Sequence, residues 1–128
     1  MATIRDVMHE GIISVGPTST VAEAATVMGG KHVGSAMVME GEKVLGIFTE
    51  RDIVRALSQD FDAPGHVVTH WMTTNPTTVG PEMPVEEALG LMHAGGFRHL
   101  PVEEGGRIVG MVSIRDLAGP GTEPGGST

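Results

Sequence analysis

The segment GIFTERD at residues 46–52 returns 64 residues further on as GMVSIRD at residues 110–116. The same shift, without a gap, places VGP at residues 15–17 on VGP at residues 79–81. Further identities keep this register through both halves, which chance matches would not do. The sequence therefore indicates a tandem duplication, and we expect each copy to fold in the same way.

The duplication divides the chain into two repeats. We expect the first repeat at residues 1–59 and the second at residues 66–118, joined by residues 60–65. A lone unit of about 60 residues buries too little surface to be comfortably stable, so the two should pack together on a pseudo-twofold axis. Paired clefts, a common place for small-molecule sites, would form where the repeats meet. Residues 119–128 are mostly Gly, Pro, Ser and Thr, and we expect a disordered tail there.

Hydrophobic spacing gives both repeats the same order of elements: helix, strand, helix, strand, strand, helix. This order predicts an α+β fold of two β-α-β-β-α repeats, each opened by a short amphipathic helix. The expected strands and later helices are a strand at 12–15 and 77–79, a helix from about Thr20 and from Pro84, strands at 36–39 and 44–48 and again at 100–103 and 108–112, and a last helix after Thr49 and Ser113.

The opening helices are apolar on one face. We expect these faces to join two copies in a closed twofold dimer, with Trp71 at that interface or between the repeats. The residues concerned are Ile4, Val7 and Met8 in the first repeat and Val68, Trp71 and Met72 in the second.

Composition excludes several classes of protein. Eight Lys and Arg against 16 Asp and Glu give a net charge of −8, which disfavours nucleic-acid binding because the phosphate backbone would be repelled. With no cysteine, disulfide scaffolds, thiolate zinc sites and cysteine nucleophiles are ruled out. No apolar run reaches the roughly 18 to 20 residues of a membrane span, and the N-terminus lacks a signal-peptide pattern. We expect a soluble, cytoplasmic protein.

The repeated segment has two interpretations. Its glycine, Gly46 or Gly110, lies within a strand and is explained if a ligand or another backbone approaches closely. Thr49 suits a helix N-cap, and Asp52 three residues later fits a capping box. The same groups would also suit a nucleotide, since a helix N-terminus with a hydroxyl and an Arg binds phosphate and a carboxylate binds a ribose diol. The residues alone leave both interpretations open.

The order of these elements resembles a known family. Two copies of a strand–helix–strand–strand–helix unit ending in Gly-h-h-Thr/Ser-x-x-Asp are similar to a pair of cystathionine-β-synthase (CBS) domains, also called a Bateman module. Supporting strings are DVM at 6–8, WMTTNP at 71–76 and FRHLPV at 97–102. The resemblance covers residues 3 to about 118. It implies adenine-nucleotide binding between the repeats and stacking of two modules into a disk-shaped homodimer.

The resemblance also implies which residues touch the ligand. Asp52 and Asp116 would hold ribose hydroxyls, with Thr49 and Ser113 at the ribose or phosphate. Adenine would contact main-chain groups of the strand that precedes each hairpin turn, with apolar side chains against its ring. The candidate residues are Gly34, Ser35, Ala36, Thr49, Arg51, Asp52, Asn75, Pro76, Thr77 and Thr78 for the first site, and Gly11, Ile12, Ile13, Phe97, Arg98, His99, Leu100, Ser113, Arg115 and Asp116 for the second.

The two sites should be unequal. Gly34 and Ser35 stand where the second repeat has Arg98 and His99, so the second site is richer in phosphate-binding groups. We expect a regulatory module that binds AMP, ADP or ATP, the last with or without Mg²⁺, and signals to a separate protein. The alternatives are a dimerising scaffold without ligand and, least favoured, a small nucleotide-processing enzyme, because Asp52 supplies only a single carboxylate to its repeat.

We expect neither a catalytic residue nor a metal site. His66 and His70 lie one helical turn apart, but the sequence offers no third ligand, so a solvated helix start is the preferred interpretation.

Overall fold

The computed structural model describes residues 1–118, so the tail predicted for residues 119–128 lies outside the described part. The chain forms two compact units whose bounds differ from those of the sequence repeats. One, here called the Asp52 unit, is Ile13–Pro76; the other, the Asp116 unit, joins Met1–Ile12 to the chain from Thr77 onward. Each unit therefore contains residues of both repeats.

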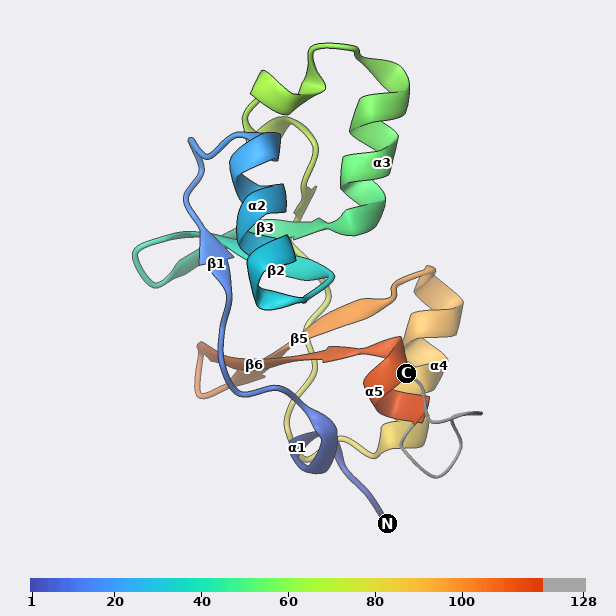
Figure 1. Cartoon of the computed structure of the whole chain (residues 1–128). Coiled ribbons are helices and arrows are strands. Elements are labelled where there is room, and N and C mark those ends of the chain that lie inside the picture. Colours follow the sequence, from blue (N-terminus) through green and yellow to red (C-terminus); the bar gives the residue numbers. More distant parts are fainter. Residues whose placement is uncertain (119–128) are drawn as a thin grey trace. The chain divides into compact units, whose positions relative to one another are not determined.

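The Asp52 unit is built on a four-stranded sheet in the order β1-β2-β3-β4 (Figure 1). β2 and β3 form an antiparallel hairpin, β1 joins β2 in parallel, and β4 joins β3 antiparallel. Helices α2 and α3 contact each other beside this hairpin. The elements are β1 Ser14–Val15, α2 Val21–Lys31, β2 Ser35–Glu40, β3 Lys43–Thr49, α3 Glu50–Gln59, the 3₁₀ helices η1 Ala63–Gly65 and η2 Val68–His70, and β4 Thr73–Thr74.

The Asp116 unit repeats this plan around a second antiparallel hairpin, β5–β6. Val79 forms a parallel β-bridge with Val102, in the place where β1 pairs with β2 in the Asp52 unit. His9 forms an antiparallel β-bridge with Met111, in the place where β4 pairs with β3. Helices α4 and α5 contact each other (Figure 1). The elements are α1 Ile4–Val7, α4 Val85–Gly95, β5 His99–Glu104, β6 Arg107–Ser113 and α5 Ile114–Ala118. The α+β fold with two similar repeats is confirmed.

The two repeats exchange their opening segments. Thr73, from the start of the second repeat, pairs with Ile47 in the first hairpin, and His9, from the start of the first repeat, pairs with Met111 in the second. A Cβ atom added to Gly46 in the first hairpin would lie 2.6 Å from the Thr73 carbonyl oxygen. A Cβ atom added to Gly110 in the second hairpin would lie 2.7 Å from the His9 carbonyl oxygen. These glycines, Gly46 and Gly110, thus admit a crossing backbone, as the sequence predicted.

The N-terminal segment is fastened to the Asp116 unit by side chains and backbone. Ile4 is buried in the core of this unit, and its N–H donates to the Met83 carbonyl oxygen at 2.9 Å. The exposed Arg5 pairs with Glu82 at 2.8 Å and Glu104 at 2.7 Å. The hydrogen bond to Glu82, followed by that to Glu104, raises the pKa of the Arg5 guanidinium above its ordinary value. These contacts hold the segment that carries His9.

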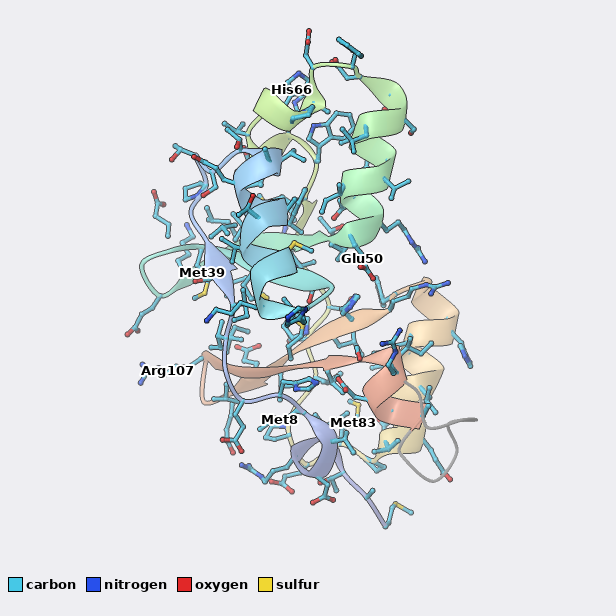
Figure 2. All side chains as sticks on the ribbon, in the orientation of Figure 1. Met8, Met39, Glu50, His66, Met83 and Arg107 are labelled. Carbon is cyan, nitrogen blue, oxygen red and sulfur yellow. The ribbon has the colours of Figure 1, made fainter. Side chains whose placement is uncertain are left out.

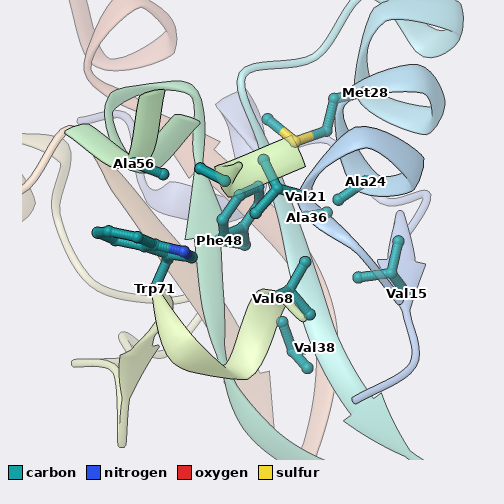
Figure 3. Close-up of a cluster of buried hydrophobic side chains, with 11 residues drawn as sticks. Val15, Val21, Ala24, Met28, Ala36, Val38, Phe48, Ala56, Val68 and Trp71 are labelled. Carbon is teal, nitrogen blue, oxygen red and sulfur yellow. The ribbon is translucent and has the colours of Figure 1, made fainter. Parts of the chain in front are cut away.

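Each unit has its own core, filled mainly by small and aliphatic side chains because the chain has few aromatic residues. In the Asp52 unit, Phe48 and Trp71 lie among buried side chains of α2, β2 and η2 (Figure 3). In the Asp116 unit, Leu100 and Val112 of the hairpin lie in one buried cluster with Met92 of α4. No helix within residues 1–118 is both long and apolar enough to cross a membrane.

The dimer face predicted on the opening helices was wrong. Ile4 and Val68 are fully buried in their own units. Trp71, from the second repeat, packs in the core of the Asp52 unit against side chains of the first repeat, so it lies between the repeats, the other of its two predicted places. Helical spacing shows that a face is buried but not which surface covers it. On α3, by contrast, two apolar side chains are well exposed, Val54 at 67% and Leu57 at 51%.

Some predicted elements are shorter than expected. The second opening helix is the 3₁₀ turn η2, and β1 begins at Ser14 rather than Ile12. Residues 77–79 contribute only the Val79 bridge, because prolines at 76 and 81 bound them and proline cannot donate to a strand ladder. Pro84 precedes α4 as its N-cap rather than lying in its first turn.

Candidate functional site

The repeated Thr/Ser-x-x-Asp segments form capping boxes where a strand passes into a helix. The Thr49 N–H donates to Asp52 Oδ2 at 2.9 Å, and the Asp52 N–H donates to Thr49 Oγ1 at 3.3 Å. In the second repeat, the Ser113 N–H donates to Asp116 Oδ2 at 2.8 Å, and the Asp116 N–H donates to Ser113 Oγ at 3.2 Å. The capping interpretation is therefore confirmed for both segments.

Strand pairing brings the predicted adenine-contacting segments to these capping boxes. Ser35 lies opposite Thr49 in the first hairpin, as His99 lies opposite Ser113 in the second. The Glu50 N–H, where α3 begins (Figure 2), donates to the Gly34 carbonyl oxygen at 3.0 Å. In the second unit the Ile114 N–H donates to the Arg98 carbonyl oxygen at 2.8 Å. Each unit therefore gathers hydroxyl, carboxylate and strand main chain at one place.

Two of the apolar candidates point into the core. Ala36 and Leu100 are fully buried in the clusters of their own units, so their side chains face away from any ligand at the capping box. Phe97 is partly buried against the same cluster as Leu100. The sequence assigned apolar side chains to the adenine ring, but at Ala36 and Leu100 only main-chain atoms are available for it.

The Asp52 carboxylate is fully engaged. Its Oδ2 accepts from Thr49, and its Oδ1 lies 3.3 Å from Nη2 of Arg55. The same Arg55 nitrogen donates to the Trp71 carbonyl oxygen at 2.7 Å, and the guanidinium lies 5.2 Å from the centroid of the Trp71 ring. The Asp52 side chain is only 10% exposed. Arg55 thus links α3 to Trp71, in the turn that precedes β4, and holds the Asp52 carboxylate at the same time.

The Asp116 carboxylate has a different partner. Its Oδ2 accepts from Ser113, and its Oδ1 lies 3.0 Å from Nε2 of His9. The Asp116 side chain is 16% exposed, whereas that of His9 is 71% exposed. The second carboxylate is therefore covered by a side chain that itself lies largely in water.

The arginines of the second site are exposed. The guanidinium groups of Arg98, before β5, and Arg115, in α5, make no hydrogen bond or ion pair within residues 1–118. Arg51, the counterpart of Arg115 in α3, is exposed but has an interaction partner. The predicted inequality of the sites thus extends to the availability of their cationic groups.

Other candidates are divided between the units. Pro76 and Asn75 follow β4 in the Asp52 unit, whereas Thr77 and Thr78, predicted for the same site, belong to the Asp116 unit. Thr78 donates its hydroxyl to Glu103 at 3.1 Å. Gly11 and Ile12 follow His9 within the Asp116 unit, but Ile13 belongs to the Asp52 unit and packs against its core.

Two neighbours of the carboxylates were missed in the sequence. Arg55 lies three residues after Asp52, a helical spacing at which opposite charges meet, so the sequence contained a local signal for it. His9 lies 107 residues from Asp116 and is brought there only by the exchange of opening segments, for which the sequence has no local signal. Within residues 1–118 no three His, Asp or Glu side chains gather as a metal site would require. His66 instead stacks on Trp71, 6.1 Å between ring centroids.

Comparison with known proteins agrees with this geometry. The chain is 34% identical to the CBS domain-containing protein YhcV of Bacillus subtilis over 92% of its own length and 84% of that protein. Its fold matches the crystal structure of a CBS-domain containing protein, ATU1752 of Agrobacterium tumefaciens, with a TM-score of 0.88 and 32% identity, covering 91% of this chain and 97% of the other.

Two more distant structures share the fold alone. They are the CBS domain pair of protein MJ0100, with a TM-score of 0.83 and 24% identity over 91% of this chain and 93% of that one, and CBSX2, with a TM-score of 0.77 and 23% identity over 92% and 94%. The family model of the CBS domain matches residues 4–59 and again residues 67–119. With both repeats matched and the two hairpin units built alike, the chain belongs to the CBS domain family.

Proposed function

We propose that this CBS domain pair is a regulatory module that binds an adenine nucleotide at its capping-box carboxylates and signals its occupancy to a separate protein. The observation that carries the proposal is the Asp116 site. There a mostly buried carboxylate, a serine hydroxyl and strand main chain lie together with two exposed arginines, Arg98 and Arg115, close by in the sequence.

The chemistry of a nucleoside fits this set of groups. A ribose diol donates two hydrogen bonds, and an ionised carboxylate such as Asp116 accepts two. The strand main chain beside Ser113 offers donors and acceptors for the edge of a base. A phosphate on the 5′ carbon suits a guanidinium, which can bind it through two parallel hydrogen bonds. AMP satisfies all three requirements.

Relatives of the same fold support an adenine compound. The MJ0100 domain pair was solved with 5′-methylthioadenosine and S-adenosyl-L-methionine, and CBSX2 with AMP. At their level of identity these structures show that the fold accommodates such molecules. The net charge of −8 favours AMP over an unshielded triphosphate, whereas Mg²⁺ would offset the charge of ATP.

The proposal is regulatory rather than catalytic. Each capping box contributes one carboxylate, and both of its oxygens hold structural partners, so neither Asp52 nor Asp116 is placed as a general base. Binding of a ligand to one conformation shifts the population of the module, and a partner protein that prefers that conformation reads the shift. The proposal puts the module in the cytoplasm, where adenine nucleotides are made and consumed.

A homodimer is part of the proposal, although by another surface than the opening helices. Val54 and Leu57 lie one turn apart on α3 and are exposed, which favours contact with the same face of a second copy. A dimerising scaffold without ligand is the second candidate function. It is favoured by the capping boxes themselves, which are complete as they stand.

A thermal-shift panel tests the proposal. A ligand that binds only the folded state at 100 times its Kd stabilises by about 2.7 kcal/mol, which raises the melting temperature by several degrees. We expect AMP, ADP or ATP with Mg²⁺ to do so, and GMP, which differs only in the base, to have a smaller effect. The panel should also include S-adenosylmethionine and NAD. If no adenine compound raises the melting temperature, the proposal is contradicted, and a dimerising scaffold without ligand is the remaining function.

A further inference from the structure

The two ribose-binding carboxylates of the proposed function are held by partners that the duplication does not relate. The shift of 64 residues that superposes Asp52 on Asp116 places His9 on Thr73, not on Arg55. Arg55 reaches Asp52 from the same helix, whereas His9 reaches Asp116 from the exchanged opening segment. The carboxylates are therefore equivalent in the fold but differ in what a ligand must displace.

At Asp52 the partner is anchored independently of the carboxylate. The Arg55 guanidinium donates to the Trp71 carbonyl oxygen at 2.7 Å, a shorter contact than its 3.3 Å to Asp52, and lies over the Trp71 ring. Arg55 therefore stays beside Asp52 whether or not the carboxylate turns toward another donor.

At Asp116 only the main chain of the partner is anchored. The His9 N–H donates to the Met111 carbonyl oxygen at 2.9 Å, and the Met111 N–H donates to the His9 carbonyl oxygen at 2.9 Å. The imidazole itself makes one hydrogen bond within residues 1–118, the 3.0 Å bond between Nε2 and Asp116 Oδ1. A change of rotamer would carry the ring into water, where most of it already lies, without disturbing the strand pairing.

We propose that His9 is a specificity-determining residue of the Asp116 site, where it competes with the ribose for Asp116 Oδ1. This rests on the proposed function, since it assumes that a nucleoside uses this carboxylate. Nε2 of His9 lies 3.0 Å from Oδ1, the atom that a ribose hydroxyl needs, and its N–H donates to that oxygen of the ionised carboxylate. A ligand must replace the His9 hydrogen bond with one of its own. Only a ligand whose donors have the geometry of the ribose diol therefore binds favourably at this carboxylate.

The test is a titration of AMP followed by the backbone amide signals of Ser113 and Asp116, which report this site alone. We expect His9→Ala to bind AMP roughly three- to tenfold more tightly than the wild type. In this variant AMP no longer has to break the hydrogen bond between His9 and Asp116, so the net free energy of that bond no longer opposes binding. His9→Gln, whose amide also donates, should stay near the wild type. His93→Ala, an exposed histidine of α4 in the same unit, is the matched control and should leave the affinity unchanged.

A second measurement separates the competition from the proposed function. In the free protein, the ring nitrogen signals of His9 should shift in Asp116→Asn, and those of His93 should not. An unmoved His9 ring, or a His9→Ala variant that binds AMP no better than the wild type, overturns the role of His9 even if AMP binds. If His9 responds to Asp116→Asn but neither wild type nor His9→Ala binds an adenine compound, the proposed function is what fails, and the competition falls with it.

Discussion

Replacing Asp116 with Asn separates ligand binding from helix capping. An Asn side chain keeps one oxygen, which can still accept the Ser113 N–H now bound at 2.8 Å. The other contact is to His9, whose side chain is 71% exposed, whereas that of Asp116 is 16% exposed. Because water reaches this pair from the His9 side, we expect it to contribute about 1 kcal/mol or less. We therefore expect Asp116→Asn to lower the free energy of unfolding by no more than about 1 kcal/mol.

The effect of the same change on binding should be larger. Asn replaces one of the two acceptors that a ribose diol needs with a donor and removes the charge. Hydrogen bonds to a charged group contribute roughly 1.5 to 3 kcal/mol. This corresponds to a Kd for AMP raised about 10- to 150-fold at the Asp116 site. Calorimetric titration with AMP and urea unfolding of the same samples give both quantities.

Asp52→Asn is the matched variant in the other unit. It neutralises a carboxylate that is only 10% exposed and that faces Arg55, so we expect about 1.5 to 3 kcal/mol of destabilisation, the range for a hydrogen bond to a charged group. AMP affinities unchanged in both Asn variants, with AMP bound by the wild type, would refute the reasoning and leave both aspartates as caps. A loss of several kcal/mol in unfolding free energy would refute the estimate of stability instead.

Three further outcomes follow from the geometry. Arg98→Ala should lower the affinity for AMP about tenfold at the Asp116 site but leave the affinity for adenosine unchanged. Lys43→Ala, in the other unit, should change neither affinity, and calorimetric titration with both ligands measures these effects. Gly110→Ala should lower the free energy of unfolding in urea by about 1 to 3 kcal/mol, because its Cβ would lie 2.7 Å from the His9 carbonyl oxygen. The comparison is Gly105→Ser in the β5–β6 turn. Nothing lies within 4 Å of a Cβ there, so this change meets only the strain of a positive φ. Leu57→Asp should shift light scattering from dimer to monomer without lowering the melting temperature, and a variant that stays dimeric excludes α3 from the interface.

The sequence predicted the parts of the site that are local. Thr49 and Asp52 lie three residues apart, and a capping box needs only that spacing and the start of a helix. The strand pairing that brings Gly34 to Glu50 follows from the two predicted strands at 36–39 and 44–48, because the short turn between them, with Gly41 at a φ of 62°, closes a hairpin. The duplication then extended both predictions to the second repeat.

The parts that failed depend on contacts between distant segments. The glycine at position 110 indicated that something crosses the strand, but not that the segment would be the one carrying His9. Likewise, the spacing of Val68 and Trp71 showed a buried face without showing that α3 and the first hairpin cover it. The segment that pairs beside each hairpin comes from the other repeat. Packing over the whole chain decides this, and no local pattern in the sequence shows it.

A crystal structure of the chain with AMP would show whether a ribose binds the Asp116 carboxylate. We expect the ribose hydroxyls within hydrogen-bond distance of Asp116, the His9 ring turned away from Oδ1, and the phosphate beside Arg98 or Arg115. AMP bound at another place, with Nε2 of His9 still 3.0 Å from Asp116 Oδ1, would contradict ribose binding at Asp116.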